Sequence, residues 1–209
     1  MTPIQHTIIG LPSSGKTTFL AALWHLLDAG EVSSKFVLDK LEGDRTHLNT
    51  IAEAWRKCEE VPRTSMAAET TVSIHVKETT SGKTSILNFP DLSGESFELQ
   101  LSSRLCRPDF IEGLDGSGGI LLFINANRSS DGITIADIAP LIPPGELEGQ
   151  SEDHRDWEPE VVPVQVRLVE LLQFLQQLPF QRRIRRVSVI VSAWDVIESP
   201  DINPLLWLE

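Results

Sequence analysis

The sequence predicts a three-layer α/β fold in which helices cover a mostly parallel β-sheet. Short apolar runs typical of buried strands alternate along the chain with segments whose apolar residues recur at helical spacing. A glycine-rich loop joins the first apolar run to the first helical segment, and two later runs are separated only by a short polar turn. The alternation favours parallel strands, and the short turn adds one antiparallel hairpin strand.

Each element is predicted from its own pattern. The first strand is a continuous apolar run, the hairpin strands alternate apolar with polar residues, and the first helix ends before Gly30. The expected strands are residues 4–9, 71–77, 84–89, 119–125 and 187–192. The expected helices are residues 16–27, 48–58, 96–106 and 164–178.

The composition indicates one ordinary globular domain. The chain has 209 residues, of which 41% are hydrophobic and 23% charged, enough for one sizeable core. We therefore expect a single domain over residues 1–209, with an acidic, proline-rich insertion at about 127–163. That insertion is interpreted as a solvated loop, with docking of a partner as the alternative.

Several classes of protein are disfavoured by the sequence. No apolar run reaches the roughly 20 residues that span a bilayer, and the N-terminus lacks the pattern of a signal peptide, so we expect a cytoplasmic protein. A net charge of −12 disfavours nucleic-acid binding. Cys58 and Cys106 lack the spacing of a zinc site or a disulfide framework.

Residues 10–17 read G-L-P-S-S-G-K-T and match the phosphate-binding loop (P-loop) G-x-x-x-x-G-K-[ST]. The loop stands between a strand and a helix, which is the context in which backbone N–H groups cradle phosphate, and the fold expected is therefore that of a P-loop NTPase. Lys16 is expected to reach the β- and γ-phosphates, and Thr17 to ligate Mg²⁺. The remaining nucleotide-binding candidates here are Gly10, Ser13, Ser14, Gly15 and Thr18.

Two further aspartates follow predicted strands. Asp91 emerges after the strand at 84–89, where it can hold Mg²⁺ through a water, and Gly94 lets its N–H approach the γ-phosphate. Asp195 follows the strand at 187–192. Its carboxylate can accept both the N1–H and the exocyclic amine of guanine, a pairing that adenine does not offer. An N-cap or turn role is the alternative for Asp195.

The P-loop, Asp91-x-x-Gly94 and strand-terminal Asp195, in this order and spacing, resemble a Ras-like GTPase of the translation-factor-related class. More narrowly, the segments Pro-Arg-Thr at 62–64, Asp-Leu-Ser-Gly-Glu at 91–95 and Ser-Ala-Trp-Asp at 192–195 resemble bacterial double-GTPase domains of conflict and defence-type systems. The resemblance implies GTP or GDP and Mg²⁺ as ligands, and a protein effector or partner subunit.

The resemblance also implies roles for the loops that respond to nucleotide. Thr64 of switch I would close on Mg²⁺, with Thr70 and Thr71 as alternatives, and switch II would begin at Asp91. Arg63 would act as an arginine finger in cis, the alternative being a solvent-exposed side chain. Glu95 stands where the Ras-like pattern often has a water-orienting glutamine, which implies slow hydrolysis, the alternative being a solvated glutamate.

Three features depart from the Ras-like pattern. Glu95 is the first, and the second lies in the guanine motif, where Ser192 and Ala193 replace the usual Asn-Lys. We expect this change to remove the amide that braces the loops and to weaken guanine selectivity. The third is that the sequence stops before a last strand and helix, so we expect either a continued natural chain or a partner that covers the exposed sheet edge.

These observations lead to a Mg²⁺-dependent GTP-binding protein with slow GTPase activity, acting as a switch. The alternative is a nucleotide-bound scaffold module with little turnover, favoured by Glu95 and by the altered guanine motif. A P-loop kinase ranks third because no lid with catalytic arginines is recognisable and Asp195 would have no role.

Overall fold

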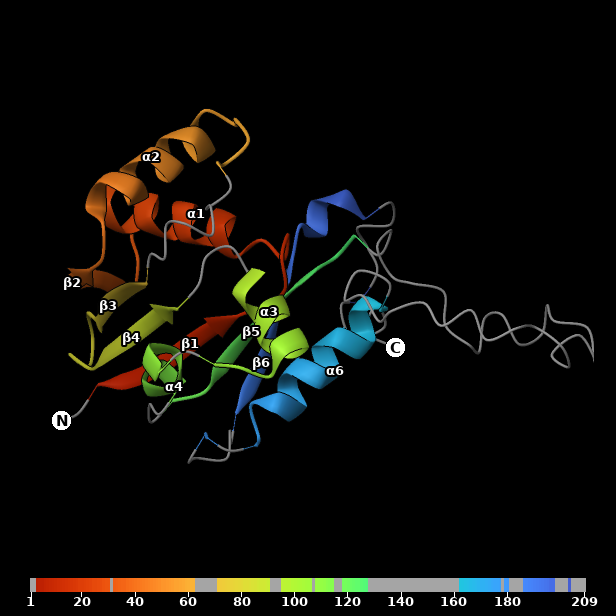
Figure 1. Cartoon of the computed structure of the whole chain (residues 1–209). Coiled ribbons are helices and arrows are strands. Elements are labelled where there is room, and N and C mark those ends of the chain that lie inside the picture. The colour runs from red at the N-terminus through yellow and green to blue at the C-terminus, as the bar shows by residue number, and fades with distance from the viewer. Residues whose placement is uncertain are drawn as a thin grey trace, which may run out of the picture.

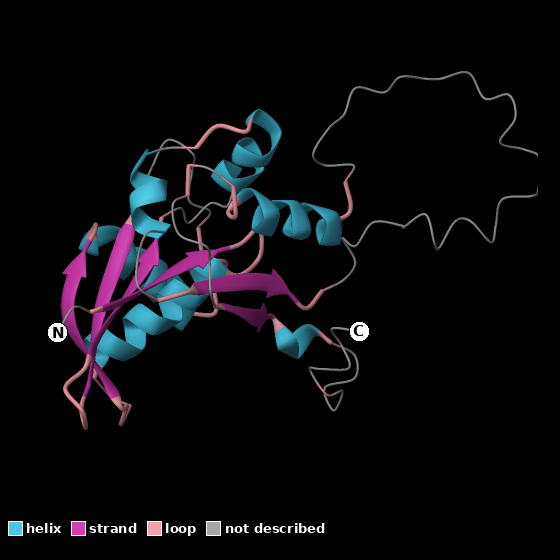
Figure 2. Ribbon diagram, turned by 90° about the horizontal axis from the view of Figure 1, so that it is seen from below, coloured by secondary structure: helices cyan, strands magenta, loops and turns pink. Residues whose placement is uncertain are grey.

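The computed structural model describes residues 3–30, 32–62, 71–90, 95–106, 108–114, 118–127, 162–177, 179–180, 186–197 and 203. Within them, six strands form one mixed sheet with helices on both faces (Figures 1 and 2). The strands are β1 (Ile4–Ile9), β2 (Phe36–Glu42), β3 (Val72–Glu78), β4 (Thr84–Phe89), β5 (Ile120–Asn125) and β6 (Val187–Ser192). The helices are α1 (Lys16–Ala29), α2 (Arg45–Arg56), α3 (Glu95–Ser103), α4 (Pro108–Leu114), α6 (Val164–Phe174) and the 3-10 turn η4 (Trp194–Val196).

The strand order in the sheet is β2-β3-β4-β1-β5-β6. β1 lies between β4 and β5 and is parallel to both, and β6 is parallel to β5. The β3–β4 hairpin is antiparallel, as is the pairing of β2 with β3. The predicted fold class, a mostly parallel α/β sheet with a hairpin, is therefore confirmed. The carboxyl ends of β1, β5 and β6 meet at one edge of the sheet, which is where the candidate site residues gather.

The strand β2, the helix α4 and the 3-10 turn η4 were not anticipated from the sequence. β2 (Phe36–Glu42) is an edge strand, exposed along most of its length, and it is held by its pairing with β3. α4 (Pro108–Leu114) is a single short helix. The second predicted helix begins three residues earlier than expected, at Arg45, because the Asp44 side chain accepts a hydrogen bond from the Thr46 N–H at 2.8 Å and caps the helix.

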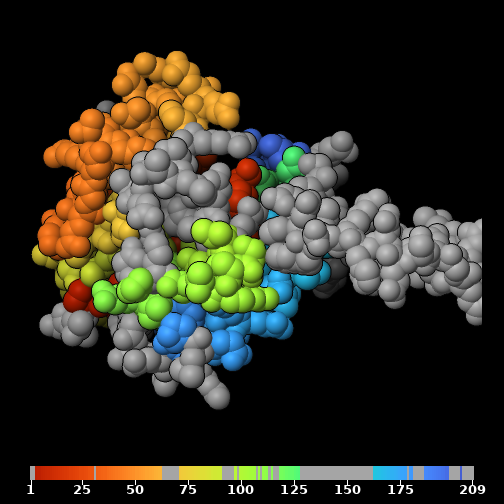
Figure 3. Space-filling model, in the orientation of Figure 1, coloured from red at the N-terminus to blue at the C-terminus, as the bar shows by residue number. Residues whose placement is uncertain are grey.

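Each face of the sheet buries its own apolar cluster. On one face, α1 and α2 cover residues that include Ile8, Ile74 and Phe89, and the largest side chain is the fully buried Trp24 of α1. The Trp24 indole N–H donates to Asn49 Oδ1 of α2 at 2.9 Å. The other cluster joins α3, α4 and α6 to the opposite face, the side on which these helices lie together in Figure 3.

Several sequence expectations fall on residues outside the described part. These are the insertion at 127–163, except for Asn127 and residues 162–163, and most of the chain after residue 197. The single-domain assignment and the expected lack of a last strand remain predictions. In the part of the chain that the structure describes, no helix is long and apolar enough to cross a membrane.

Candidate functional site

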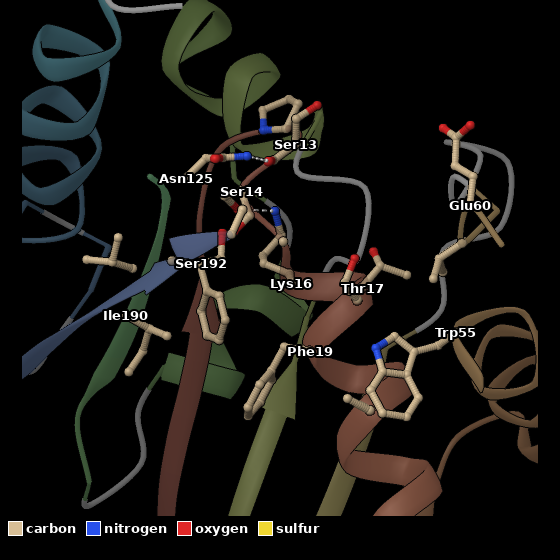
Figure 4. Close-up of a pocket in the computed structure, with 18 of the residues that line it drawn as sticks. Ser13, Ser14, Lys16, Thr17, Phe19, Trp55, Glu60, Asn125, Ile190 and Ser192 are labelled. Atoms are coloured by element: carbon tan, nitrogen blue, oxygen red, sulfur yellow. Dashed lines mark hydrogen bonds between the residues drawn. The ribbon is translucent and has the colours of Figure 1, made fainter. Parts of the chain in front are cut away.

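A pocket of about 640 Å³ opens at the carboxyl edge of the sheet, around the loop between β1 and α1. The P-loop forms one side of it, and the ends of β5 and β6 form another (Figure 4). A third side comes from the end of α2 and the residues after it. The lining residues from the P-loop and α1 are Pro12, Ser13, Ser14, Gly15, Lys16, Thr17, Thr18, Phe19 and Ala22.

Both glycines of the P-loop motif lie so close to neighbouring strands that a larger residue would clash. A Cβ atom on Gly10 would lie 2.7 Å from the Phe123 carbonyl oxygen of β5, so only glycine lets the loop leave β1 this close to the neighbouring strand. Gly15 has a φ of 85° and caps the N-terminus of α1. A Cβ there would lie 2.7 Å from Ser192 Oγ. The two glycines therefore let the loop backbone come close to the neighbouring strands β5 and β6.

Lys16 is 2% exposed, and its ammonium lies inside the P-loop. The Lys16 Nζ donates hydrogen bonds to the carbonyl oxygens of Gly10 at 2.8 Å and Leu11 at 2.9 Å, and to Ser14 Oγ at 3.2 Å. These acceptors offset the cost of burying a charge and hold the cation beside the pocket. The ring of Phe97 from α3 lies 5.9 Å from the same ammonium. This arrangement places one fixed positive charge at the expected phosphate position.

The N-terminus of α1 adds to this positive field. Gly15 makes no side-chain capping hydrogen bond, and the first turn of α1 contains no acidic residue. A helix end of this kind favours an anion, because the helix dipole and the first N–H groups both point toward it. Thr17 lies in this first turn and lines the pocket. Its hydroxyl is a hard oxygen donor of the kind that Mg²⁺ accepts, so the residue expected to hold the metal fits that role.

Two strand ends are fastened to the P-loop. The Asn125 side chain at the end of β5 donates from Nδ2 to the Ser13 carbonyl oxygen at 3.0 Å. At the end of β6, Ser192 Oγ lies 2.9 Å from the Ser14 carbonyl oxygen and 3.2 Å from that of Ile124. Position 192 lacks the usual amide, as expected from the sequence, but its hydroxyl contacts the loop directly, and Asn125 brings a separate amide to the same loop.

The loop after β6 brings Asp195 to the pocket. Ala193 has a φ of 53°, and this left-handed turn leads into η4, which carries Asp195. Asp195 is exposed and lines the pocket together with Ile190 and Val191 of β6. The carboxylate predicted to read the base and the lysine predicted to bind phosphate thus border the same pocket.

The sequence analysis did not predict that the end of α2 and the residues after it line the pocket. Trp55 of α2 is half-buried and lines the pocket, as do Glu60, Val61 and Pro62. Figure 4 shows Trp55 on the side of α1 opposite Asn125 and Ser192. The Trp55 ring also lies 5.7 Å from that of His25 in α1. An aromatic residue near the end of a predicted helix gives no sign of this placement until the packing of α2 on α1 is known.

Some predicted site residues lie outside the described part of the chain. These are Arg63, Thr64, Thr70, Asp91 and Gly94. Glu95 is the first residue of α3, but its side chain is not described. Thr71 is exposed just before β3. Within the described residues, no group of three or more His, Cys, Asp or Glu side chains forms a metal cluster.

The strand, loop and helix around Lys16, placed on a sheet of this order, define a protein of the P-loop nucleotide-binding class. The family model Double-GTPase 1 matches residues 7–209, and the chain therefore belongs to this family. Membership implies binding of guanine nucleotide, and the resemblance to double-GTPase domains seen in the sequence is confirmed. A comparison with curated proteins finds no match.

Proposed function

We propose that this protein is a Mg²⁺-dependent GTP-binding protein that hydrolyses GTP slowly and acts as a nucleotide-controlled switch in a multi-protein bacterial system. The observation that carries the proposal is the buried Lys16 ammonium, held by P-loop carbonyls at a pocket that extends to Asp195. Family membership supports the choice of guanine nucleotide. A cytoplasmic location and a protein effector or partner subunit are parts of the same proposal.

Phosphate binding follows from the charges around the P-loop. Lys16 and the N-terminus of α1 provide positive potential at one end of the pocket, where the β- and γ-phosphates are expected to lie. Thr17 is the described residue that would ligate Mg²⁺, which when bound neutralises charge on the phosphate oxygens. Water attacks the γ-phosphorus in line, and Lys16 stabilises the charge that develops, so positioning supplies most of the rate.

Base recognition is assigned to Asp195. Its carboxylate would accept from the N1–H and exocyclic amine of guanine, and its position on the pocket rim supports this role. The apolar side chains of Phe19 and Ile190 line the same pocket and offer surfaces for the flat faces of a base. ATP lacks the paired donors and leaves a carboxylate facing the adenine N1 acceptor, which lowers its affinity.

The remaining roles rest on the resemblance. We assign Thr64 and Asp91 to Mg²⁺, Gly94 to the γ-phosphate, Arg63 to the transition-state charge and Glu95 to a slow hydrolytic step. The expected switch loops around Thr64 and Gly94 would order around the γ-phosphate. Their ordering in the triphosphate state is the proposed switch.

A multiple-turnover phosphate-release assay with GTP and Mg²⁺ tests this function. Lys16→Ala should abolish turnover and weaken nucleotide binding, because the fixed charge of the site is lost. Lys83→Ala is a matched control, since Ser81-Gly82-Lys83-Thr84 repeats the residues of the P-loop but forms part of the exposed β3–β4 turn. Unchanged GTP affinity in Lys16→Ala would exclude the proposed site.

A nucleotide-bound scaffold module with little turnover is the second candidate. Glu60 lines the pocket, and the resemblance assigns Glu95 to the neighbourhood of the γ-phosphate. Negative charge near the γ-phosphate slows its transfer. Stable bound GTP with no released phosphate in the same assay favours the scaffold, whereas turnover that disappears in Lys16→Ala favours the enzyme.

A further inference from the structure

Five carbonyl oxygens of the P-loop, those of Gly10, Leu11, Ser13, Ser14 and Gly15, accept hydrogen bonds from several elements. Lys16 Nζ takes those of Gly10 and Leu11, and the Phe19 N–H takes that of Gly15 at 2.9 Å. Asn125 and Ser192 take those of Ser13 and Ser14. A carbonyl oxygen carries partial negative charge and repels phosphate, so hydrogen bonds that hold the loop carbonyls away from the pocket favour anion binding by its N–H groups.

Asn125 and Ser192 act on consecutive peptide groups. The Ser13 carbonyl belongs to the peptide that ends in the Ser14 N–H, and the Ser14 carbonyl to the peptide that ends in the Gly15 N–H. A trans peptide is planar, and its C=O and N–H point in opposite directions. A hydrogen bond that holds a carbonyl toward β5 or β6 therefore directs the N–H of the same peptide group away from that strand. The two side chains therefore set the orientation of the loop backbone at its second glycine.

The two donors come from paired positions in the sheet. Asn125 and Ser192 are register partners at the ends of the parallel strands β5 and β6. The Asn125 amide has its orientation fixed at both ends, since Oδ1 accepts from the Asn127 N–H at 2.8 Å. Ser192 lies so close to Gly15 that its Cβ would be 2.8 Å from a Cβ placed there. A short hydroxyl side chain thus reaches the Ser14 carbonyl in the narrow space between strand and loop.

We propose that Asn125 and Ser192 together are positioning residues for nucleotide phosphate, and that Asn125 supplies from β5 the amide that position 192 lacks. This inference rests on the proposed nucleotide binding. Asp195 lies three residues after Ser192, so the same strand end joins the loop that reads the base to the loop that binds phosphate. The altered guanine motif is thereby compensated by a residue of a different strand.

The test compares Ser192→Ala, Asn125→Ala and the double variant, with Ser188→Ala on the same strand as control. Calorimetry should show the GDP Kd rising about fivefold to tenfold in each single variant, the size expected for one lost hydrogen bond. Guanosine, measured by competition, should bind all variants equally, because it has no phosphate. The melting temperature of the nucleotide-free protein should fall by no more than about 4 °C.

Hydrogen–deuterium exchange of the nucleotide-free protein provides a readout that needs no ligand. Amides of residues 10–18 should exchange faster in Ser192→Ala and Asn125→Ala than in the wild type or in Ser188→Ala. Unchanged exchange together with unchanged GDP affinity would overturn the inference, as would an equal loss of guanosine and GDP affinity. If the wild type binds no nucleotide, the proposed function fails. Faster exchange in Ser192→Ala and Asn125→Ala would then show only that these two side chains stabilise the conformation of the loop, and their role in phosphate binding would fall with the proposed function.

Discussion

Gly15 of the P-loop lies against Ser192 of β6, so that a Cβ atom on Gly15 would be 2.7 Å from the Ser192 hydroxyl oxygen. Gly15→Ala should therefore weaken GDP binding at least about tenfold, because the positive φ and the contact both oppose the added methyl. Isothermal titration measures the affinity. Adding Ser192→Gly removes the contact but not the backbone strain, and should restore part of the stability of the nucleotide-free protein. A Gly15→Ala protein that binds GDP normally would contradict the observed packing.

Trp55 lines the pocket from α2 and should report nucleotide binding. We expect GDP to change the tryptophan emission of the wild type, since the indole is half-buried and its solvent contact alters when the pocket fills. In Trp55→Phe most of this change should disappear while binding, followed by calorimetry, is retained. A full emission change in Trp55→Phe would place the nucleotide away from this wall.

The pairing of Trp24 with Asn49 should stabilise the packing of α1 on α2. Trp24→Ala removes a fully buried indole and should lower the free energy of unfolding by about 3–5 kcal/mol. Asn49→Ala leaves the Trp24 N–H without its acceptor and should cost about 1–3 kcal/mol. Urea unfolding measures both values. A neutral Asn49→Ala would mean that water replaces the lost acceptor.

His6 in β1 should make stability depend on pH. Burial, and then the positive charge of Arg186, lower the pKa of His6 below its ordinary value, so the folded state favours the neutral imidazole. This contribution is present above the unfolded pKa of about 6.5 and is lost as pH falls through the folded pKa. Urea unfolding between pH 7.5 and 5.5 should show a smaller decline in His6→Gln than in the wild type or in the His25→Gln control. An identical decline in all three would contradict this assignment.

Most of the elements that carry the site could be predicted because their signals are local. The strands around residues 4–9, 84–89 and 187–192 have bounds that agree with the structure, and the P-loop motif lies where a strand meets a helix. β2 could not be predicted in this way, because its apolar residues Phe36, Val37, Leu38 and Leu41 do not alternate with polar ones, and the strand depends on its partner β3. α4 is too short to show helical spacing and contains a glycine.

Candidate site residues could be predicted only where the signal lies within a single segment of the sequence. Lys16, Thr17 and Asp195, which line the pocket, could be selected as candidates because each follows a strand or belongs to a motif. Asn125 could not, since its role depends on the register between β5 and β6 and on a contact with Ser13, 112 residues away in the sequence. Trp55 likewise becomes a pocket residue only through the packing of α2 on α1. A contact between segments that are far apart in the sequence produces no local pattern from which it could be predicted.

The choice of base is the central claim, and a calorimetric titration with GTP, GDP and ATP in Mg²⁺ tests it most directly. The wild type should prefer guanine nucleotides, and Asp195→Ala should lose that preference while Asp39→Ala, on the exposed strand β2, keeps it. The physical reason is the paired acceptance of two guanine donors by one carboxylate. Equal binding of GTP and ATP by the wild type, or a guanine preference that survives Asp195→Ala, would contradict the account.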